Sequence, residues 1–244
     1  TARTCYSGKG IVTPEEVAGA GQPTEIVVAR RSKRDELAAD LYQAGHHTTF
    51  QHAYFQFSIA NVSRQCLWSF LHSHPFYNSE QVSQRYVTVK DGNYAVPPLE
   101  GQALTAYLET AEWMVADYRR LSVELEPLCA RVFYERFPAR RAQPDRWAKE
   151  IRKKAQEIAR YVLPVATFAY LYHTVSAVTL FRYRRLCELH DAPFEQRLLV
   201  EQMVAEVLLH EPDYATLLEQ PIPHHETVEA QALASLSARP PRRD

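Results

Sequence analysis

Glycine is scarce in this chain, with seven in 244 residues. The sequence contains neither a G-x-G-x-x-G turn nor a P-loop, the two glycine-rich segments whose backbone amides hold nucleotide phosphates. A nucleotide or flavin would therefore bind without a Rossmann domain. Side chains must hold any anionic ligand, and arginine, which far outnumbers lysine here, is the better bidentate partner for phosphate.

Cysteine and long apolar runs are also sparse. The four cysteines are widely spaced and form no C-x-x-C pair, so neither a zinc site nor a disulfide framework is indicated. No apolar run approaches the ~20 residues that span a bilayer, and the first residues lack a signal-peptide pattern. The net charge of -1 argues against a nucleic-acid surface. These absences predict a cytoplasmic protein with reduced thiols and with neither a membrane nor a nucleic-acid partner.

Hydrophobic periodicity predicts both strands and helices. Apolar residues alternate over 53–59 and 167–175, which is typical of half-buried strands. Apolar residues at helical spacing predict helices after Ser32 and Ser63, over about 101–137 (one helix or a broken pair), from Pro144, up to about Cys187, and over about 193–210. The pattern predicts an α+β fold, with one domain over residues 1–219 and a mixed or antiparallel sheet flanked by long helices. Residues 220–244 lack a periodic pattern, and this absence predicts a poorly structured tail.

Local signals predict where several of these elements begin and end. Ser32 opens a segment that resembles a capping box, and Gly45 is placed to end the helix that follows. Ser63 is placed to cap the next helix, and Pro75 prevents that helix from running on.

Histidines gather around the first predicted strand. A metal site is the sharpest interpretation, but no H-E-x-x-H occurs and no Asp or Glu lies within the histidine stretch. Capping hydrogen bonds are the favoured interpretation, and a His-rich metal hydrolase stays a less favoured alternative. The histidines are His46, His47, His52, His72 and His74.

Arg160 stands out among the arginines because it lies at the end of an apolar stripe. A cation in such surroundings needs an anionic partner, and a phosphate would serve. A Ser or Cys nucleophile is poorly supported, since Ser83 has no G-x-S-x-G elbow and Cys66 falls on an apolar helix face.

Several segments, taken in order along the chain, resemble one protein family. The segments are Ala2-Arg3-Thr4-Cys5-Tyr6, Gly45 to His52 (GHHTTFQH), Ser63-Arg64 with Ser83-Gln84-Arg85-Tyr86-Val87, and Ala159 to Pro164 (ARYVLP). Their order and spacing are similar to those of the flavin-dependent thymidylate synthases, over residues 1 to about 218. The resemblance implies that family's fold for residues 1–219.

The resemblance implies reductive methylation at C5 of a uracil nucleotide. Methylenetetrahydrofolate supplies the carbon, NADPH reduces a bound FAD, and the flavin delivers a hydride. The resemblance also implies a homotetramer with flavin and nucleotide sites at subunit interfaces.

The hallmark R-H-R-x-x-S of the family is altered here. It falls on His72-Ser73-His74 or on Ser73-His74-Pro75, depending on the alignment, so both signature arginines are absent. This divergence resembles the branch in polyoxin-type nucleoside-antibiotic pathways that methylates UMP, and we expect UMP as substrate with dUMP as a second one. A dUMP-specific thymidylate synthase and a non-catalytic nucleotide- or flavin-binding paralogue remain alternatives.

The resemblance assigns roles to individual residues. It implies catalytic roles for Arg160, Ser83 and Arg85. It implies nucleotide contacts for Ser69, Gln81, Ser83, Gln84, Arg85, Arg160, Arg184 and Arg185. It implies FAD contacts for His46, Thr48, Gln51, Ser176 and Arg182. In the altered hallmark segment and just after it, His72, Ser73, His74 and Asn78 are expected to replace the missing FAD donors. No metal ligand is predicted.

Overall fold

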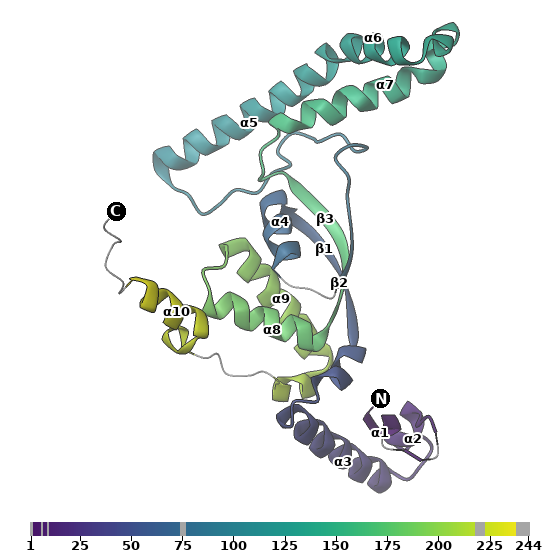
Figure 1. Ribbon diagram of the computed structural model, residues 1–244, viewed down its shortest axis with the longest axis vertical. Coiled ribbons are helices and arrows are strands. Elements are labelled where there is room, and N and C mark those ends of the chain that lie inside the picture. The colour runs from purple at the N-terminus through teal and green to yellow at the C-terminus, as the bar shows by residue number, and fades with distance from the viewer. Residues whose placement is uncertain (1, 6, 9, 74–76, 218–222, 238–244) are drawn as a thin grey trace. The chain divides into compact units, whose positions relative to one another are not determined.

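The computed structural model describes residues 2–5, 7, 8, 10–73, 77–217 and 223–237 (Figure 1). The chain divides into two compact units. Unit 1 comprises residues 1–57, 72–78 and 174–244, and unit 2 comprises residues 58–71 and 79–173. Among the described residues, none of the helices combines the length and apolar character that a bilayer crossing needs.

The described strands form one three-stranded sheet in the order β1-β3-β2. Hydrogen bonds beyond both ends of the β1–β3 pair are antiparallel, because Arg64 N donates to Thr167 O (3.0 Å) and Ala177 N donates to Ala53 O (3.0 Å). The predicted α+β fold with strands near 53–59 and 167–175 is confirmed. The strands are β1 (Tyr54–Ser63), β2 (Tyr77–Gln81) and β3 (Phe168–Ser176).

The alternation of buried and exposed side chains along β1 is interrupted at Ala60 and Asn61, which are both exposed. Asn61 has a φ of 57°, in the left-handed region that asparagine tolerates better than most residues. Ile59 and Val62 are both buried, although they are three positions apart. The backbone conformation at Asn61 therefore shifts the alternation by one residue, so that the side chains of Val62 and Ser63 at the end of β1 are buried.

In unit 1 the helices α8 and α9 pack against each other. Among their buried side chains are Val178, Tyr183, Val200 and Met203. The helical elements of this unit are α1 (Ala2–Cys5), α2 (Pro14–Ala18), α3 (Thr24–Gln43), η1 (His47–His52), α8 (Ala177–Leu189), α9 (Phe194–His210), η4 (Pro212–Leu217), η5 (His224–Glu226) and α10 (Val228–Ser237).

The start of α3 differs from the prediction. The helix begins at Thr24 rather than after Ser32, whose hydroxyl donates to Glu36 Oε1 (3.2 Å) inside the helix. The prediction was wrong because the first two turns bury no side chain and so carry no apolar stripe. The predicted end is confirmed, since Gly45 takes a φ of 78° just past the last turn.

Unit 2 contains a helical arm, in which α5 and α6 lie alongside α7 (Figure 1). Of the two predicted possibilities, one long helix or a broken pair, the structure has the pair, because α5 ends at Glu124 and α6 starts with Pro127 in its first turn. Tyr118 and Ala159 belong to one buried cluster and Ile151 and Ala155 to another, and together they hold α7 in place. The helical elements are α4 (Arg64–His72, whose last residue falls in unit 1), α5 (Gly101–Glu124), α6 (Glu126–Arg136), η2 (Pro138–Ala142), α7 (Pro144–Ala159) and η3 (Arg160–Val162).

The first turn of α4 is capped as predicted. Cys66 N donates to the Ser63 hydroxyl oxygen (2.9 Å), which satisfies one of the free amides at the helix start. Cys66 and Phe70 point into the core. The predicted effect of Pro75 lies outside the described residues.

Candidate functional site

Distant segments of unit 2 meet at the start of α4. Arg64 N donates to Thr167 O (3.0 Å), which fixes α4 against the loop that enters β3. Val82 N donates to Tyr170 O (3.0 Å), so the chain leaving β2 lies beside β3. The start of α4, the entry to β3 and the residues after β2 are thus held together by backbone hydrogen bonds.

The Arg64 side chain bridges two of these segments. Its Nη1 donates to Gln81 Oε1 (2.8 Å), and its Nη2 donates to Val82 O (2.6 Å). Its Nε is buried and has no hydrogen-bond acceptor among the described residues. Burial and, after it, the nearby positive charge of Arg160 lower the pKa of the Arg64 guanidinium. Two arginines therefore lie within electrostatic reach of each other.

The residues Ser83 to Val87 form a tight turn. The Ser83 carbonyl accepts from Tyr86 N and Val87 N, both at 3.2 Å, and the Ser83 hydroxyl accepts from Arg85 N (3.3 Å). Such a serine-closed turn defines the backbone locally. The Arg85 guanidinium is 54% exposed and lies 3.8 Å from Glu157 Oε1, a weak pairing that leaves it available to another anion.

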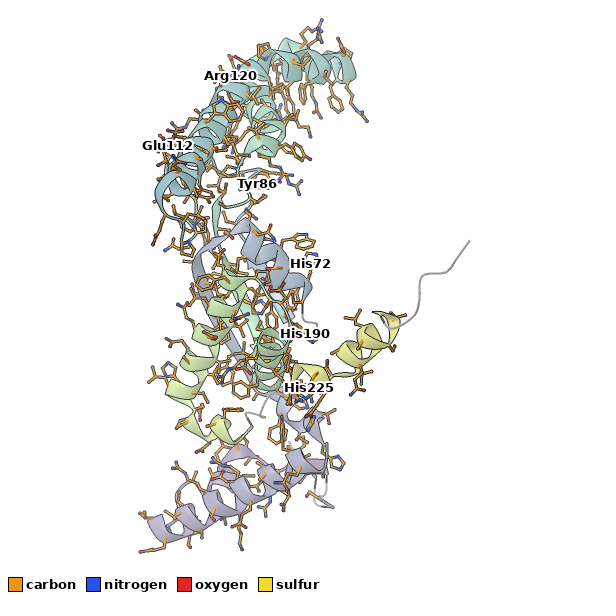
Figure 2. The ribbon with its side chains drawn as sticks, turned by 90° about the vertical axis from the view of Figure 1, so that its left-hand side faces the viewer. His72, Tyr86, Glu112, Arg120, His190 and His225 are labelled. Carbon is orange, nitrogen blue, oxygen red and sulfur yellow. The ribbon has the colours of Figure 1, made fainter. Side chains whose placement is uncertain are left out.

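This turn and the residues after it lie along α7 of the arm. The Tyr86 ring, labelled in Figure 2, is exposed and lies 5.4 Å from the Lys153 ammonium. Thr88 donates to Gln156 Oε1 (3.4 Å), one helical turn before Arg160. The turn, the last part of α7 and Arg160 therefore belong to one neighbourhood of unit 2.

Most of the residues with implied nucleotide contacts gather in this neighbourhood, and three do not. Ser69 is buried, and its hydroxyl donates to Cys66 O (3.0 Å) in its own helix. Arg184 and Arg185 lie on α8 in unit 1, where Arg184 pairs with Glu188 at 3.0 Å. The residues in the neighbourhood of unit 2 are Gln81, Ser83, Gln84, Arg85 and Arg160.

All of the described residues with implied FAD contacts lie in unit 1. On η1 and just before it, the side chains of His46 and Thr48 are exposed and Gln51 is half-buried. The segment is stabilised by Thr49, whose hydroxyl donates to His46 O (3.0 Å). Its polar side chains are therefore presented to solvent by an ordered backbone.

His47, which the sequence analysis considered among the histidines but to which the resemblance assigned no FAD contact, connects η1 to Arg182 of α8. Its ring stacks on Tyr42 with centroids 4.6 Å apart, and its Nε2 lies 3.0 Å from Tyr42 O. A carbonyl only accepts, so Nε2 carries the proton and Nδ1 accepts from Arg182 Nη2. His47 stands beside His46 in the GHHTTFQH segment, and this adjacency was the one signal that pointed to it.

Ser176 acts within the fold as the N-cap of α8. It is buried, its hydroxyl oxygen accepts from Thr179 N (3.3 Å), and it donates to Thr179 Oγ1 (2.8 Å). The hydroxyl is thus engaged at both its donor and an acceptor position.

The rewritten half of the hallmark segment is only partly described. His72, labelled in Figure 2, ends α4, and Ser73 accepts from the buried Gln196 Nε2 (3.4 Å). Asn78 is exposed on β2. His74 lies outside the described residues.

Unit 1 contains a cavity of about 1150 Å³ between its N-terminal segments and α3. Thr49 and Phe50 of η1 line it, next to the residues with implied FAD contacts. Its wall combines apolar side chains with one acidic residue, Glu16, and several basic ones. The basic residues are Arg3, Arg30, Arg31, Lys33 and Arg34.

Two of these basic side chains already have partners. Arg30 Nη1 donates to Glu16 O, and Arg34 Nη2 lies 2.6 Å from Asp35 and 2.9 Å from Asp213. The remaining basic side chains suit an anionic group, and the apolar side chains of the wall suit a large apolar group, so the cavity could hold a ligand that carries both. No group of three His, Cys, Asp or Glu side chains arranged to hold a metal ion occurs in the described part of the chain.

Comparison with known proteins identifies an enzyme of the thymidylate synthase type. Residues 1–213 match the thymidylate synthase complementing protein family, and the chain belongs to that family. The resemblance recognised in the sequence and the flavin-dependent, thymidylate synthase-like class of enzyme are confirmed.

Several known proteins are similar to this chain. It is 29% identical over 209 residues to the flavin-dependent thymidylate synthase of Clostridium tetani, which covers 84% of this chain and 74% of that protein. It is 30% identical over 168 residues to the enzyme of the same name from Mycobacterium tuberculosis, which covers 68% of this chain. The chain spans 56% of the length of the mycobacterial relative.

A solved structure has the same fold. It is the UMP/dUMP methylase PolB from Streptomyces cacaoi bound with 5-Br dUMP, which matches with a TM-score of 0.54 at 19% identity. The match covers 87% of this chain and 84% of PolB.

Proposed function

We propose that this protein methylates C5 of a uracil nucleotide, with UMP as its substrate and dUMP as a second one. Methylenetetrahydrofolate is the carbon donor, and NADPH is the reductant. One observation carries the proposal: an arginine-bearing turn and Arg160 lie in the same neighbourhood of unit 2, in a chain of the thymidylate synthase complementing protein family. The fold of the methylase PolB supports UMP as a substrate.

The nucleotide binds at the turn in unit 2. Arg85, with only a weak carboxylate contact, and the backbone amides around Ser83 receive the phosphate. Gln81 and Gln84 complete the polar rim. Arg160 approaches the pyrimidine, where a guanidinium stabilises negative charge on the ring oxygens and so favours the enolate-like form of uracil from which C5 attacks a carbon electrophile. These contacts give Arg160, Ser83 and Arg85 their proposed catalytic roles.

FAD binds in unit 1, and the residues present fit it. The basic side chains around the cavity suit a pyrophosphate, and its apolar wall suits a ring system. His46, Thr48 and Gln51 lie beside the cavity-lining Thr49 and Phe50, and Arg182 is joined to the same segment through His47. When bound, FAD supplies the hydride that completes the methyl group.

The cysteines support a reaction that uses no enzyme thiolate. Cys66, Cys129 and Cys187 are buried and free. Burial raises the pKa of the Cys129 and Cys187 thiols, which disfavours the nucleophilic thiolate form. Carbon transfer then depends on positioning and electrostatics supplied by the arginines.

Most of the nucleotide residues fall in unit 2 and the described flavin residues fall in unit 1, and we propose that assembly completes the active site. The protein acts as a homotetramer in the cytoplasm, with its sites at subunit interfaces, and serves nucleoside-antibiotic biosynthesis. Exposed apolar side chains on α3 support an assembly surface, since Ile26 is 40% and Val28 60% exposed.

The test is the visible spectrum of the purified protein, followed by turnover with methylenetetrahydrofolate, NADPH and either UMP or dUMP. We expect flavin absorbance and a 5-methylated product with a higher specificity constant for UMP. A strong preference for dUMP would identify a standard thymidylate synthase. Flavin or nucleotide binding without turnover would identify a non-catalytic paralogue, and a colourless protein that binds neither ligand would refute the proposal.

A further inference from the structure

Arg64 has a charge that no described carboxylate balances. Neither Arg64 nor Arg160 has a salt bridge among the described residues, although other arginines of unit 2 do, such as Arg119 with Asp91 at 2.6 Å. Arg64 is half-buried, and its buried Nε lacks an acceptor. An unsatisfied donor on a buried charged group is costly, so this arrangement calls for a compensating anion.

The hydrogen bonds of Arg64 hold the two residues that directly precede the Ser83–Val87 turn. Its two Nη atoms hold Gln81 Oε1 and Val82 O, the positions directly before Ser83. The planar guanidinium is rigid, so two bonds to adjacent residues constrain both their spacing and their direction. The Arg64 amide is itself bonded to Thr167, just before β3, and Val82 N donates to Tyr170 O of β3. The Arg64 side chain and this backbone hydrogen bond therefore together hold the start of the turn at β3.

The charge of Arg64 adds to that of Arg160. The two guanidiniums repel each other at this partly buried location, where interactions between charges are less screened than in water. An anion bound at the Ser83–Arg85 turn, directly after the Gln81 and Val82 contacts of Arg64, reduces that repulsion, and a dianion reduces it more than a monoanion does. A phosphate monoester is therefore favoured over an uncharged nucleoside.

We propose that Arg64 is a positioning residue that sets the Ser83–Arg85 turn and thereby selects nucleotides bearing a 5′-phosphate. It acts through Gln81 and Val82 on the turn and through its charge on the ligand, without touching the reacting atoms. This inference rests on the proposed nucleotide site and adds to it a residue that the family motif did not assign a role.

The experiment compares the affinities of the purified flavoprotein for UMP and for uridine by isothermal titration calorimetry. In the wild-type protein we expect UMP to bind at least about tenfold more tightly than uridine, because a tenfold ratio corresponds to the free energy of one charge-assisted hydrogen bond. Arg64→Met should remove most of that ratio while leaving uridine affinity within about twofold. Arg64→Lys keeps the charge but not the two-point bridge, and it should restore part of the ratio.

The matched control is Arg119→Met, which removes an exposed arginine of the same unit and should leave the ratio unchanged. A purely structural role would weaken UMP and uridine binding equally, and this result, like an unchanged ratio in Arg64→Met, would overturn the inference. If Arg64→Met does not fold, the ratio of UMP to uridine affinity is measured in Arg64→Lys and Gln81→Met. Each of these variants weakens the hydrogen bonding between Arg64 and residues 81–82, and each should lower the ratio. A wild-type protein that binds neither ligand would instead contradict the proposed function itself.

Discussion

Arg182 on α8 donates to Nδ1 of His47, the first residue of η1, across 135 positions of the chain. The second ring nitrogen of His47 faces the carbonyl of Tyr42 at 3.0 Å. His47 thus orients Arg182, the residue that we propose to contact FAD, and fixes η1 to α8.

The His47–Arg182 contact predicts one tautomer and one loss of function. We expect the imidazole to be protonated at Nε2, which nitrogen-15 chemical shifts would reveal. His47→Ala should release Arg182 and lower FAD affinity by about tenfold, the worth of a charge-assisted hydrogen bond. The matched control is His52→Ala at the exposed end of η1, which should retain FAD. Equal FAD affinity in His47→Ala would show that Arg182 does not need this contact.

Arg85 is expected to matter for the ligand and little for stability. Its exposed contact with Glu157 at 3.8 Å contributes less than about 1 kcal/mol to folding. Arg85→Ala should reduce nucleotide affinity by roughly 1.5–3 kcal/mol, the worth of a hydrogen bond to a charged group. Calorimetry with UMP measures the first effect and urea unfolding the second. Arg152→Ala, which removes a contact of equal length with Glu126 on the same arm, should change neither by a comparable amount.

The buried thiols predict a loss of stability at alkaline pH. Burial raises the pKa of Cys187 and Cys129 in the folded state, so above the unfolded thiol pKa of about 8.5 the unfolded chain loses these protons first. This contribution to stability is complete below that pH and disappears as the pH rises through the folded pKa values. Urea unfolding at a series of pH values should show the decline.

The double variant Cys129→Ala/Cys187→Ala serves as the comparison for this alkaline decline. It should be less stable at neutral pH because two buried groups are lost, but its stability should fall less steeply above the unfolded thiol pKa. An equally steep decline in the variant would assign the effect to other groups. Buried Tyr118 and half-buried Tyr214 are the next to consider, since desolvation raises their pKa as well.

Two isoleucines of α7 provide a matched test of how the arm is held. Ile151 is 4% exposed and packs in the cluster with Cys129 and Ala155, whereas Ile158 is 40% exposed. Ile151→Ala should lower the free energy of unfolding by about 2–4 kcal/mol, and Ile158→Ala by less than about 1 kcal/mol. Chemical denaturation measures both. Similar losses of unfolding free energy in the two variants would mean that Ile158 is buried in solution, for example by a second copy of the chain at an assembly interface.

Periodicity in the sequence was sufficient for most of the fold. The alternation over β1 and β3 and the apolar stripes of α5 to α9 predicted these elements, because burial repeats every two residues in a strand and every 3.6 in a helix. Ser63 and Gly45 marked boundaries through local hydrogen bonding and backbone conformation. The start of α3 was missed because nothing in that helix is buried before Leu41.

Arrangement in space decided the details of the sites. Only the tertiary structure shows Ser69 donating within its own helix, Ser176 capping α8, and His47 rather than His46 joining Arg182. It also separates the described residues with implied FAD contacts, all in unit 1, from the main group with implied nucleotide contacts in unit 2.

The sequence by itself determined the family and most of the secondary structure, and it predicted arginines as the anion ligands. Only the tertiary structure decided that Arg64 bridges to Gln81, 17 positions away, and that Arg160 lies near enough to shift its pKa. The physical reason is one of range. Burial patterns and caps depend on neighbours within a turn or two, whereas a contact between distant side chains depends on which strands pair and where the connecting loops return.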